Sequence, residues 1–337
     1  MAVKIAINGF GRIGRLLLRA LIERERSDLN CVLINDLGSV EDNVHLFRYD
    51  SVHGRFPGQV TIEGNCMVIT YNGRIYPPIR VTAERDPAKL PLDGVDVVTE
   101  CTGLFTKREA AAKLLDAGAR KVLISAPADG VDATVVYGVN HHTLSPDMTI
   151  ISNASCTTNC LAPMAMVLHE TFGIDRGYMV TIHSYTGDQR IVDTLHKDRH
   201  RARAAALSII PTTTGAARAL GLVLPELKGK LDGTAIRVPT PNVSLVSLDV
   251  DLKRAATKEE INAAMLAASE GRLKGILGYS TEALVSVDFN HVPYSCSFDA
   301  PQTTVIDHSF ARVMGWYDNE WGFSNRMCDT VALFGAL

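Results

Sequence analysis

The stretch "VKIAINGFGRIGRLLLRALIERER", residues 3–26, decides the fold of the first part of the chain. Its opening "VKIAING" is a continuous apolar run that ends in glycine, as expected of a buried parallel strand. The segment after the glycines carries apolar residues at the i, i+3, i+4, i+7, i+8 spacing of one helical face, namely Ile13, Leu16, Leu17, Ala20 and Leu21. The glycine-rich turn therefore joins a strand to a helix, as in the first half of a β-α-β unit.

Gly9, Gly11 and Gly14 give this turn the pattern G-x-G-x-x-G. Glycines there permit a tight turn, close approach of a pyrophosphate and close helix packing, and the helix N-terminus supplies amide groups. The motif alone is weak, because a glycine-rich turn is often only a turn. Here Asp36 also closes a second strand roughly 20 residues further on, so the context predicts a dinucleotide site. Asp36 suits the ribose hydroxyls of NAD and repels the extra phosphate of NADP, unless it only forms a solvated turn.

Further segments repeat the alternation of strand and helix through about residue 150. The strands are "NCVLIND" (30–36), "VDVVTECTG" (95–103) and "KVLIS" (121–125), with a helix through "KREAAAKLLDAGAR" (107–120). Repeated β-α-β units predict a mostly parallel sheet covered by helices, an α/β fold of the Rossmann class.

The character of the chain changes after about residue 155. Long alternating runs such as "TAIRVPTPNVSLVSLDVDL" (234–252) and "ALVSVDFNH" (283–291) suit an antiparallel sheet. One helix interrupts them, with a capping-box pattern at Thr257 and Glu260 and a stop at Gly271. The segment from Asn319 to the end is expected to form a final helix.

The composition narrows the classes of function. The 337 residues carry a formal net charge of −3, so nothing global recruits nucleic acid or an acidic membrane surface. The N-terminus has no signal-peptide pattern, and no apolar stretch approaches the ~18 residues of a membrane span. The seven cysteines are odd in number and scattered, which favours reduced thiols in a cytoplasmic compartment. Lacking a nearby His or a second pair, Cys156 and Cys160 do not predict a metal site.

Cys156 is the candidate nucleophile. It lies in "ISNASCTTNCLAP" (151–163), just before an apolar helical pattern, so we expect it at a helix N-terminus. Amide groups and the helix dipole there are expected to lower the pKa of the thiol, and the thiolate is the nucleophilic form. Cys160 falls one turn later and is expected to face the core. A lone Cys before a helix is more often structural, so the hypothesis requires a base.

His183 is the candidate base, on a predicted strand in "MVTIHSYTGDQ" (179–189). Spacing alone does not show that it meets Cys156, so a structural His remains an alternative. Thr212–Gly215 opens a predicted helix in "TTTGAAR" and could form a phosphate nest. Other candidate anion ligands are polar residues near strand ends and a basic run, namely Thr186, Asp188, Arg237, Arg199, Arg201 and Arg203. A solvated surface accounts for each of these equally well.

Several blocks resemble one known family over essentially the whole chain. They are "INGFGRIGR" (7–15), "YDSVHGRF" (49–56), "SAPA" (125–128), "SNASCTTNCLAP" (152–163), "KGKLDGTAIRVPTPNVS" (228–244), "VSVDFNH" (285–291) and "WYDNEWGFSNRM" (316–327). The sequence is similar to the phosphorylating glyceraldehyde-3-phosphate dehydrogenases of the bacterial type. "ASCTTN" together with "WYDNEWG" is highly specific for that family.

The resemblance implies a fold, a domain division and an assembly. Residues 1–155 would form an NAD-binding Rossmann domain, completed by a C-terminal helix at 319–337. Residues 156–318 would form an α+β catalytic domain with a mixed, largely antiparallel sheet. Members of the family are homotetramers.

The resemblance also implies roles for individual residues. Cys156 would be the nucleophile and His183 its base. The substrate's phosphate would be held near Thr186, Asp188 and Arg237, with help from Arg201. The inorganic phosphate would lie near Ser155, Thr157, Thr214 and Gly215. The cofactor would contact Gly9, Gly11 and Gly14, Arg12 and Ile13 beside the pyrophosphate, Asp36 at the ribose, Arg85 and Ser125 further out, and Asn319 at the nicotinamide carboxamide.

The implied reaction is an oxidoreductase step of glycolysis or gluconeogenesis. D-glyceraldehyde 3-phosphate and inorganic phosphate would give 1,3-bisphosphoglycerate with reduction of NAD, through a thiohemiacetal and a thioester on Cys156. No nucleic-acid or membrane partner is indicated. Leu195 stands where NAD-specific members usually carry Pro and NADP-using members often carry Ser, so use of NADP stays open. Arg199 and His200 replace a Leu and an Arg of the common pattern, which leaves the phosphate-binding arginine open.

Two alternatives stand beside this interpretation. An erythrose-4-phosphate dehydrogenase has the same fold, but that family tends to carry Cys at the position of Tyr317 and another residue at that of Gly215. It also carries "HSAMHDQ" where this chain has "HSYTGDQ" (183–189). A non-catalytic nucleotide-binding regulator would be expected to lack the nucleophile or the base, and both are present.

Overall fold

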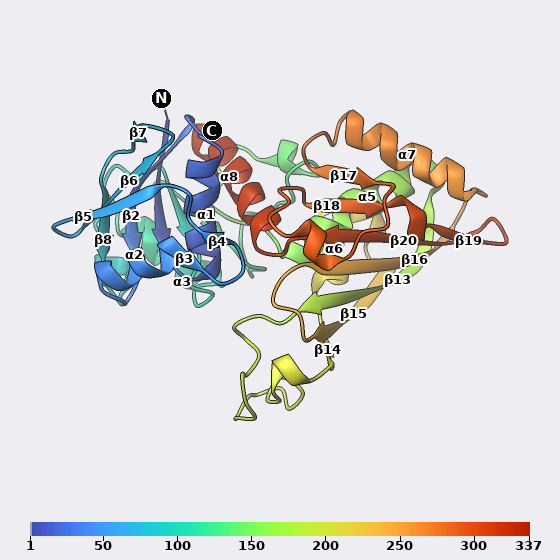
Figure 1. Cartoon of the computed structure of the whole chain (residues 1–337). Helices are drawn as coiled ribbons and strands as arrows, with labels where there is room; N and C mark the ends of the chain where they lie inside the picture. Colours follow the sequence, from blue (N-terminus) through green and yellow to red (C-terminus); the bar gives the residue numbers. More distant parts are fainter. Residues whose placement is uncertain (1) are drawn as a thin grey trace. The chain divides into compact units, whose positions relative to one another are not determined.

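The computed structural model describes residues 2–337, which form two compact units (Figure 1). The first unit comprises the residues through Val135, His141–Ala154 and Ser324–Leu337. The second comprises Val136–Asn140 and Ser155–Phe323. The chain therefore passes from the first unit to the second between Ala154 and Ser155, just before Cys156.

The first unit is built on a sheet in the order β11-β12-β10-β9-β1-β2-β8-β6-β5. All pairings from β11 to β8 are parallel, which confirms the predicted Rossmann-type arrangement. The parallel strands are β1 (Val3–Asn8), β2 (Leu29–Asn35), β8 (Ile79–Thr82), β9 (Val97–Glu100), β10 (Lys121–Ile124), β11 (Ala133–Thr134) and β12 (Ile150–Ser152). An antiparallel extension that the sequence analysis did not identify follows β8, made of β5 (Gln59–Glu63), β6 (Cys66–Tyr71) and β7 (Arg74–Ile75).

Helices from distant parts of the sequence pack beside this sheet. They are α1 (Arg12–Glu23), α2 (Val40–Arg48) and α8 (Trp321–Ala336), and Figure 1 shows the red α8 next to the blue α1. The Cys328 thiol of α8 lies 3.8 Å from the Leu17 carbonyl of α1. Residues 107–120 differ from the single helix predicted, because they form α3 (Arg108–Ala111) and α4 (Lys113–Asp116). The Leu115 N–H bonds the Ala112 carbonyl three residues back, a tighter turn than an α-helix makes.

The second unit contains a mixed sheet in the order β14-β15-β13-β16-β20-β18-β17. Two pairings, β13 with β15 and β17 with β18, are parallel, and the others are antiparallel, which confirms the predicted mixed sheet. Its strands are β13 (Ile174–Ser184), β14 (Ile210–Thr213), β15 (Leu231–Val238), β16 (Ser244–Leu252), β17 (Leu277–Ser280), β18 (Cys296–Asp299), β19 (Thr304–Ile306) and β20 (Phe310–Tyr317).

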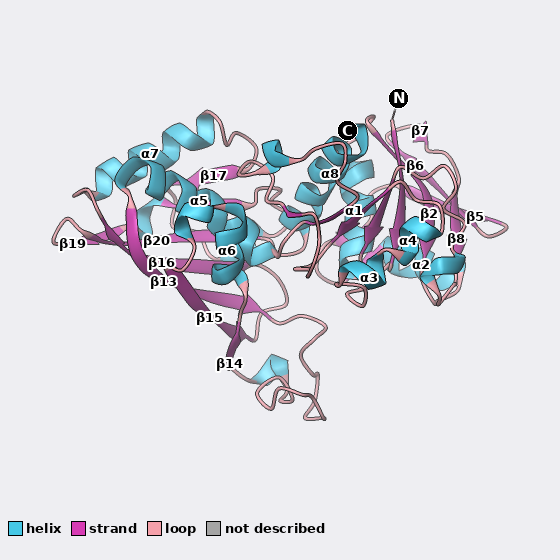
Figure 2. Cartoon of the chain, turned by 180° about the vertical axis from the view of Figure 1, so that it is seen from behind, coloured by secondary structure: helices cyan, strands magenta, loops and turns pink. Residues whose placement is uncertain are grey.

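Three helices cover one face of this sheet, as Figure 2 shows. They are α5 (Cys156–Phe172), α6 (Ala216–Val223) and α7 (Lys258–Glu270). The central helix α5 is buried along almost its whole length, which places its first residue at a fixed point over the sheet. Helix α7 has the predicted capping box between Thr257 and Glu260 and ends at Gly271, so this part of the sequence analysis is confirmed.

Among residues 2–337, no helix is long and apolar enough to cross a membrane.

Candidate active site

The glycine turn after β1 has the geometry that its sequence predicts. Gly9 adopts φ +94°, and a Cβ there would lie 2.6 Å from the Thr102 backbone nitrogen. A Cβ on Gly14 would lie 2.1 Å from the Gly9 carbonyl oxygen, so α1 packs against the turn at a distance that only glycine allows. A Cβ on Gly11 would meet nothing within 4 Å. Gly11 therefore borders open space, where a pyrophosphate could approach the helix N-terminus.

A pocket of about 320 Å³ lies beside this turn at the carboxyl ends of the parallel strands. Its lining includes Gly9, Gly11, Asp36 and Arg85, so the structure brings these predicted cofactor residues together. Asp36 Oδ2 accepts a hydrogen bond of 2.7 Å from the Phe10 N–H, which ties the carboxylate to the glycine turn. An adenosine ribose bound here would meet a fixed carboxylate, so the residues present fit NAD.

The other predicted cofactor residues of the first unit lie close to the same edge of the sheet. Arg12 begins α1 and forms an ion pair with Asp50, and Ile13 follows it in the helix. Ser125 follows β10, and its N–H bonds the Glu100 carbonyl oxygen at 3.0 Å. The position of Arg12 thus depends on a carboxylate that the sequence analysis did not identify.

A ladder of buried side chains, which the sequence analysis missed, supports this pocket. Glu100 Oε2 accepts from Asn8 Nδ2 at 2.5 Å, and Asn8 Oδ1 accepts from Asn35 Nδ2 at 2.8 Å. Asn35 Oδ1 accepts from the Thr82 hydroxyl at 2.9 Å, and Glu100 Oε1 accepts from the Thr102 N–H at 2.7 Å. Burial raises the pKa of Glu100, while hydrogen bonds from Thr102 and Asn8 oppose that shift. Polar residues that end several predicted parallel strands were the signal that could have revealed the ladder.

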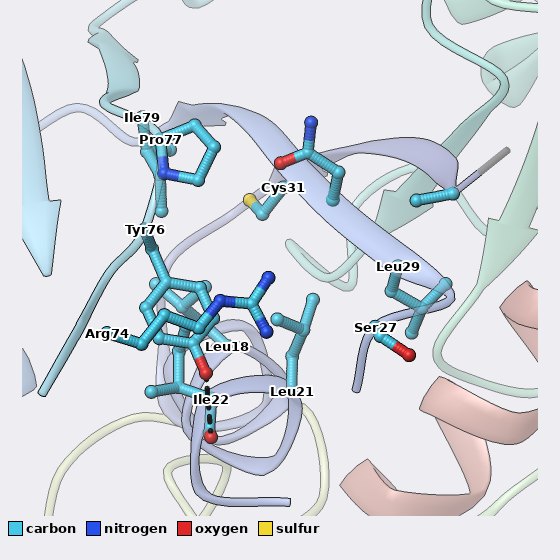
Figure 3. A pocket seen from close by; sticks show the side chains of 12 residues that line it. Leu18, Leu21, Ile22, Ser27, Leu29, Cys31, Arg74, Tyr76, Pro77 and Ile79 are labelled. Atoms are coloured by element: carbon cyan, nitrogen blue, oxygen red, sulfur yellow. Dashed lines mark hydrogen bonds between the residues drawn. The ribbon is translucent and has the colours of Figure 1, made fainter. Parts of the chain in front are cut away.

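A second pocket, of about 160 Å³, lies at the amino ends of the strands of this sheet (Figure 3). Its walls are mostly hydrocarbon, from Leu18, Leu21 and Leu29 among others. The Arg74 guanidinium lies 4.6 Å from the centre of the Tyr76 ring. Because the nucleotide pocket lies at the carboxyl ends of the strands, we assign this second pocket no part in the candidate active site.

The second unit brings Cys156 and His183 together. Cys156 is the first residue of α5, and Ser155 caps that helix by accepting a 3.1 Å hydrogen bond from the Thr158 N–H. His183 lies on β13, and its Nε2 is 3.6 Å from Cys156 Sγ. This distance is within hydrogen-bond range for sulfur, so the two candidates can exchange a proton. The predicted pairing of a helix-terminal thiol with an imidazole is thus present in the geometry.

The other side of the imidazole is held by a backbone carbonyl and a guanidinium. His183 Nδ1 lies 2.7 Å from the Ser184 carbonyl oxygen and 2.7 Å from Arg237 Nη1. The parallel register of β13 and β15 pairs His183 directly with Arg237, which explains the contact. Burial, and then the charge of Arg237, lower the pKa of His183 to about 3, against the opposing hydrogen bond to Ser184. His183 is therefore neutral near pH 7.

The pKa of Cys156 differs from the sequence-based expectation. The helix N-terminus was expected to lower it, but burial raises the pKa of the thiol above its usual value. The charge of Arg237 and hydrogen bonds from Thr157 act in the opposite direction without cancelling the effect of burial. A sequence pattern gives the helix end but not the desolvation, and desolvation is the larger effect here. Burial therefore disfavours both the thiolate of Cys156 and the charged form of His183.

Tyr317 is a site residue whose contacts the sequence analysis did not predict. Its hydroxyl lies 2.9 Å from Thr157 Oγ1 and 2.8 Å from Thr181 Oγ1, and its ring meets His183 edge-on with centroids 5.8 Å apart. Burial, and then the nearby thiols Cys156 and Cys160, raise the pKa of Tyr317 well above its usual value. The phenol thus joins β20, β13 and the first turn of α5 as a neutral hydrogen-bonding group.

The candidate phosphate ligands divide into two groups. Arg237 adjoins His183, and its Nε is buried without a hydrogen-bond partner among the described residues. Arg201 Nη1 instead donates to Asp188 at 2.6 Å, and its Nε donates to the Thr212 hydroxyl at 2.9 Å. The Thr186 N–H donates to the Gln189 side chain at 2.9 Å. Arg237 thus retains an unused donor, while Arg201 and Asp188 bind each other.

The residues expected near inorganic phosphate lie at two helix N-termini. Ser155 caps α5, and the Thr157 hydroxyl in its first turn bonds Tyr317. Gly215 is the N-cap of α6, and the Thr214 hydroxyl accepts a 3.2 Å hydrogen bond from the Ala216 N–H. A Cβ on Gly215 would meet nothing within 4 Å. These ends therefore offer backbone N–H groups more than free hydroxyls.

Asn319 and Cys160 have well-defined surroundings. Asn319 Oδ1 accepts hydrogen bonds of 2.9 Å from both the Ser184 and the Ser244 hydroxyls. These bonds fix the orientation of the amide and leave Nδ2 as its donor. Cys160 is fully buried and its thiol lies 3.6 Å from the Gly315 carbonyl oxygen, which confirms that it faces the core.

Comparison with known proteins agrees with this geometry. The family described as "Glyceraldehyde 3-phosphate dehydrogenase, NAD binding domain" matches residues 3–108. The family described as "Glyceraldehyde 3-phosphate dehydrogenase, C-terminal domain" matches residues 155–319. Among curated proteins, the chain is 61% identical to glyceraldehyde-3-phosphate dehydrogenase of Xanthobacter flavus over 100% of both chains. It is 58% identical to the Geobacillus stearothermophilus enzyme of that name over 98% of both chains. The chain therefore belongs to the glyceraldehyde-3-phosphate dehydrogenase family.

Proposed function

We propose that this chain oxidises D-glyceraldehyde 3-phosphate to 1,3-bisphosphoglycerate with NAD, using Cys156 as nucleophile and His183 as base. The observation that carries these roles is the 3.6 Å contact between Cys156 Sγ and His183 Nε2 at the start of α5. A thiol with an imidazole in hydrogen-bond reach is the arrangement of an activated cysteine nucleophile. The family and the extent of identity carry the reaction itself.

The first step forms a bond between sulfur and carbon. As Cys156 Sγ attacks the aldehyde carbon, its proton passes to His183 Nε2, which hands it to the former carbonyl oxygen, so that the thiohemiacetal forms and His183 is neutral again. His183 is neutral at the outset, so it has a free site for a proton. A donor that faces the developing oxyanion stabilises it by about 3–4 kcal/mol in comparable sites. The N–H groups of the first turn of α5 supply such donors.

NAD, when bound, would supply the hydride acceptor for the thiohemiacetal carbon. Gly9, Gly11 and Gly14 would leave room for its pyrophosphate, and Asp36 would accept hydrogen bonds from its ribose hydroxyls. We assign Arg12, Ile13, Arg85 and Ser125 to the surroundings of the same nucleotide. Asn319 would donate its Nδ2 to the carboxamide. During this step His183 removes the hydroxyl proton, so that a thioester remains on Cys156.

Phosphate then releases the product. Inorganic phosphate attacks the thioester carbon, the C–S bond breaks, and Cys156 leaves as a thiolate that regains a proton. We place this phosphate near Ser155, Thr157, Thr214 and Gly215, where two helix N-termini offer N–H groups. A thioester is the better acyl donor, so a serine ester at this position would not serve.

The substrate's own phosphate is assigned to Arg237, Thr186 and Asp188, with Arg201. Arg237 is the strongest of these assignments, because its buried Nε lacks a partner among the described residues. The negative charge of Asp188 acts through Arg201, to which it is bound at 2.6 Å. Burial raises the pKa of Asp188, but hydrogen bonds from Arg201 and His196 hold it below its usual value.

Our proposals on the assembly and on the cofactor preference rest on one exposed segment, residues 191–209. It presents several large apolar side chains to solvent in the single chain, namely Ile191, Leu195, Leu207 and Ile209. Leu195 is 93% exposed. Apolar groups of this size are expected to be covered by another protein surface. We therefore propose a homotetramer in which this loop meets a neighbouring subunit and in which Leu195 contributes to the choice between NAD and NADP.

We further propose residues 1–155 with 319–337 as the nucleotide-binding domain and 156–318 as the catalytic domain. Cys156 requires a reduced thiol, and all seven cysteines are free. We therefore place the reaction in the cytoplasm, where thiols stay reduced.

The test is reduction of NAD by glyceraldehyde 3-phosphate with and without inorganic phosphate, with NADP and erythrose 4-phosphate in parallel. Fast, phosphate-dependent reduction of NAD by the triose is the expected result. Preference for erythrose 4-phosphate, or no dependence on phosphate, would refute the proposed substrate or the phosphorylating step. A non-catalytic regulator would give no reduction at all. Size measurement by light scattering tests the tetramer.

A further inference from the structure

The side-chain amide of Asn319 is held by two serines from paired strands. Ser184 ends β13 and Ser244 begins β16, and both hydroxyls donate hydrogen bonds of 2.9 Å to Asn319 Oδ1. Asn319 is 5% exposed and the serines are 1% exposed or less. Among residues 2–337, Asn319 Nδ2 has no hydrogen-bond partner. The oxygen end of the amide is therefore anchored, and the nitrogen end is left to meet a ligand.

The hydroxyls themselves decide which end of the amide faces them. The Ser244 hydroxyl oxygen accepts a 3.1 Å hydrogen bond from the Ser184 N–H, and its single proton is then directed to Asn319 Oδ1. If the amide turned over, Nδ2 would face both hydroxyls, and their protons would lose their common acceptor. The Ser244 proton could turn to the Ser184 hydroxyl oxygen, 3.5 Å away, but the Ser184 proton would lack the acceptor that it has here. A buried donor without an acceptor is costly, so the two serines favour one orientation of the amide.

The backbone of Asn319 is fixed by a different group, the buried carboxylate of Asp318. Its Oδ1 accepts from the N–H groups of Glu320 and Trp321 at 2.9 and 2.7 Å, at the start of α8. Its Oδ2 accepts from the His291 N–H at 2.7 Å. Asp318 thus fixes where residue 319 lies, and the two serines fix which way its amide points.

An amide held in this way distinguishes a hydrogen-bond acceptor from a donor. An amide nitrogen donates and does not accept, so Asn319 Nδ2 bonds a carbonyl oxygen and not an amino group. The carboxamide of a nicotinamide ring has one group of each kind, and its carbonyl end fits. A half-turn of the ring about its bond to the ribose would carry the carboxamide away from Asn319 and present the opposite face of the ring. The orientation of one side-chain amide therefore bears on which face of the ring reacts.

We propose that Ser184 and Ser244 are positioning residues, which orient the Asn319 amide to select the carbonyl oxygen of the cofactor's carboxamide and thereby one face of the nicotinamide ring. The proposal rests on the proposed function, in which Asn319 is assigned to the carboxamide. It adds the two residues that give this contact its direction.

Binding of three nucleotides to the wild type, measured by calorimetry without substrate, tests the orientation of the amide. NAD has the whole carboxamide, 3-acetylpyridine adenine dinucleotide keeps the carbonyl but has a methyl group in place of NH2, and ADP-ribose lacks the ring. We expect the acetyl analogue to bind within about threefold of NAD, because the selected carbonyl is retained. A loss of about tenfold or more would mean that the amide oxygen binds the NH2 group, and it would overturn the proposal.

The double variant Ser184→Ala/Ser244→Ala removes both donors to the amide. We expect Kd for NAD and for the acetyl analogue to rise about tenfold, the effect of one or two hydrogen bonds, and Kd for ADP-ribose to stay unchanged. Ser244→Ala alone, which leaves the neighbour of His183 intact, should show a smaller change of the same kind. Ser295→Ala is the matched control, because that buried hydroxyl has no hydrogen-bond partner among the described residues. Unchanged Kd values for NAD in the serine variants, or an equal loss for ADP-ribose, would overturn the proposal.

The face of the ring that receives the hydride is a readout that a merely structural role would not change. With glyceraldehyde 3-phosphate deuterated at the aldehyde carbon, proton NMR of the NADH formed shows which face carries the label. We expect the label on a single face with the wild type and with Ser295→Ala, and on both faces with the double variant. Label confined to one face in the double variant would contradict selection of the face by the serines.

Asn319→Ala separates this proposal from the proposed function. It should weaken binding of NAD and leave that of ADP-ribose unchanged. If the wild type does not reduce NAD with the triose phosphate, or if Asn319→Ala binds NAD as the wild type does, the proposed function or its assignment of Asn319 fails. If Asn319→Ala is impaired and the serine variants are not, only the present proposal fails.

Discussion

The polar groups of the nucleotide pocket and those of the cysteine site are satisfied to different degrees. Hydrogen bonds link Glu100, Asn8 and Asn35 at the carboxyl ends of β9, β1 and β2. In these bonds each amide nitrogen only donates and each oxygen only accepts. At the cysteine site, His183 Nδ1 lies between two groups that require opposite roles. A binding surface can be fixed in advance by completed hydrogen bonds, whereas a reacting pair retains interactions that must change during the reaction.

The largest expected effect comes from Cys156→Ser, which removes the proposed nucleophile and leaves the proposed nucleotide pocket untouched. We expect oxidation of the triose phosphate to fall by at least about a thousandfold, with NAD binding close to that of the wild type. Cys160→Ala is the matched control, since this buried thiol does not contact the reacting atoms in the proposed mechanism. Near-normal turnover of Cys156→Ser would contradict the nucleophile assignment.

His183→Asn removes the proposed base while keeping a small polar side chain. We expect a rate loss of about 10²- to 10⁴-fold, because proton transfer by a positioned group typically contributes that factor. The pH profile should change shape, as the remaining rate then follows ionisation of the Cys156 thiol. A profile that superimposes on that of the wild type would mean that His183 is structural.

Gly14→Ala and Gly11→Ala form a matched pair in the nucleotide pocket. Gly14→Ala places a methyl group 2.1 Å from the Gly9 carbonyl oxygen, so the helix must shift, at a cost of about 2–3 kcal/mol in unfolding free energy. Gly11→Ala meets no atom within 4 Å, and we expect the melting temperature to change little while KM for NAD rises. Thermal melts and KM values of both variants separate the effect on folding stability from the effect on NAD binding. Equal melting temperatures would refute the packing argument for Gly14.

Acid stability tests the buried imidazole. The pKa of His183 is lowered from 6.5 to about 3, so below pH 6.5 the unfolded chain binds a proton that the folded chain refuses. Folding stability is therefore present above pH 6.5 and is lost as pH falls toward 3, at about 1.4 kcal/mol per pH unit from this group. Urea unfolding of wild type and His183→Asn at several pH values should show this slope in the wild type only. Parallel slopes would contradict the neutral buried His.

The smallest expected effect concerns the polar ladder. Glu100→Gln gives the carboxyl position a donor that faces the Asn8 amide, and we expect KM for NAD to rise several-fold with kcat nearly unchanged. Adding Asn8→Asp restores a hydrogen bond of reversed polarity, since the Gln amide can donate to the new carboxylate. Recovery of KM in the double variant supports the ladder, and additive losses would argue against it.

Much of this fold could be predicted from the sequence because local patterns determine it. The glycine turn, the capping box of α7 and the start of α5 at Cys156 follow from side chains close in sequence. The contact of His183 with Arg237 could not be predicted, because it depends on which strand neighbours β13. The prediction that the pKa of Cys156 is lowered was wrong for a related reason, since desolvation depends on packing by distant segments. The contacts of Tyr317 could not be predicted either, because they join side chains from three separate elements.

The most direct test of the central claim is to trap the acyl group. The protein is mixed with glyceraldehyde 3-phosphate and NAD in the absence of inorganic phosphate, and its peptides are mapped by mass spectrometry. We predict a phosphoglyceroyl thioester on Cys156 that disappears when phosphate is added and never forms in Cys156→Ser. An acyl group on another residue, or NADH formed without any acyl group on the protein, would contradict the account.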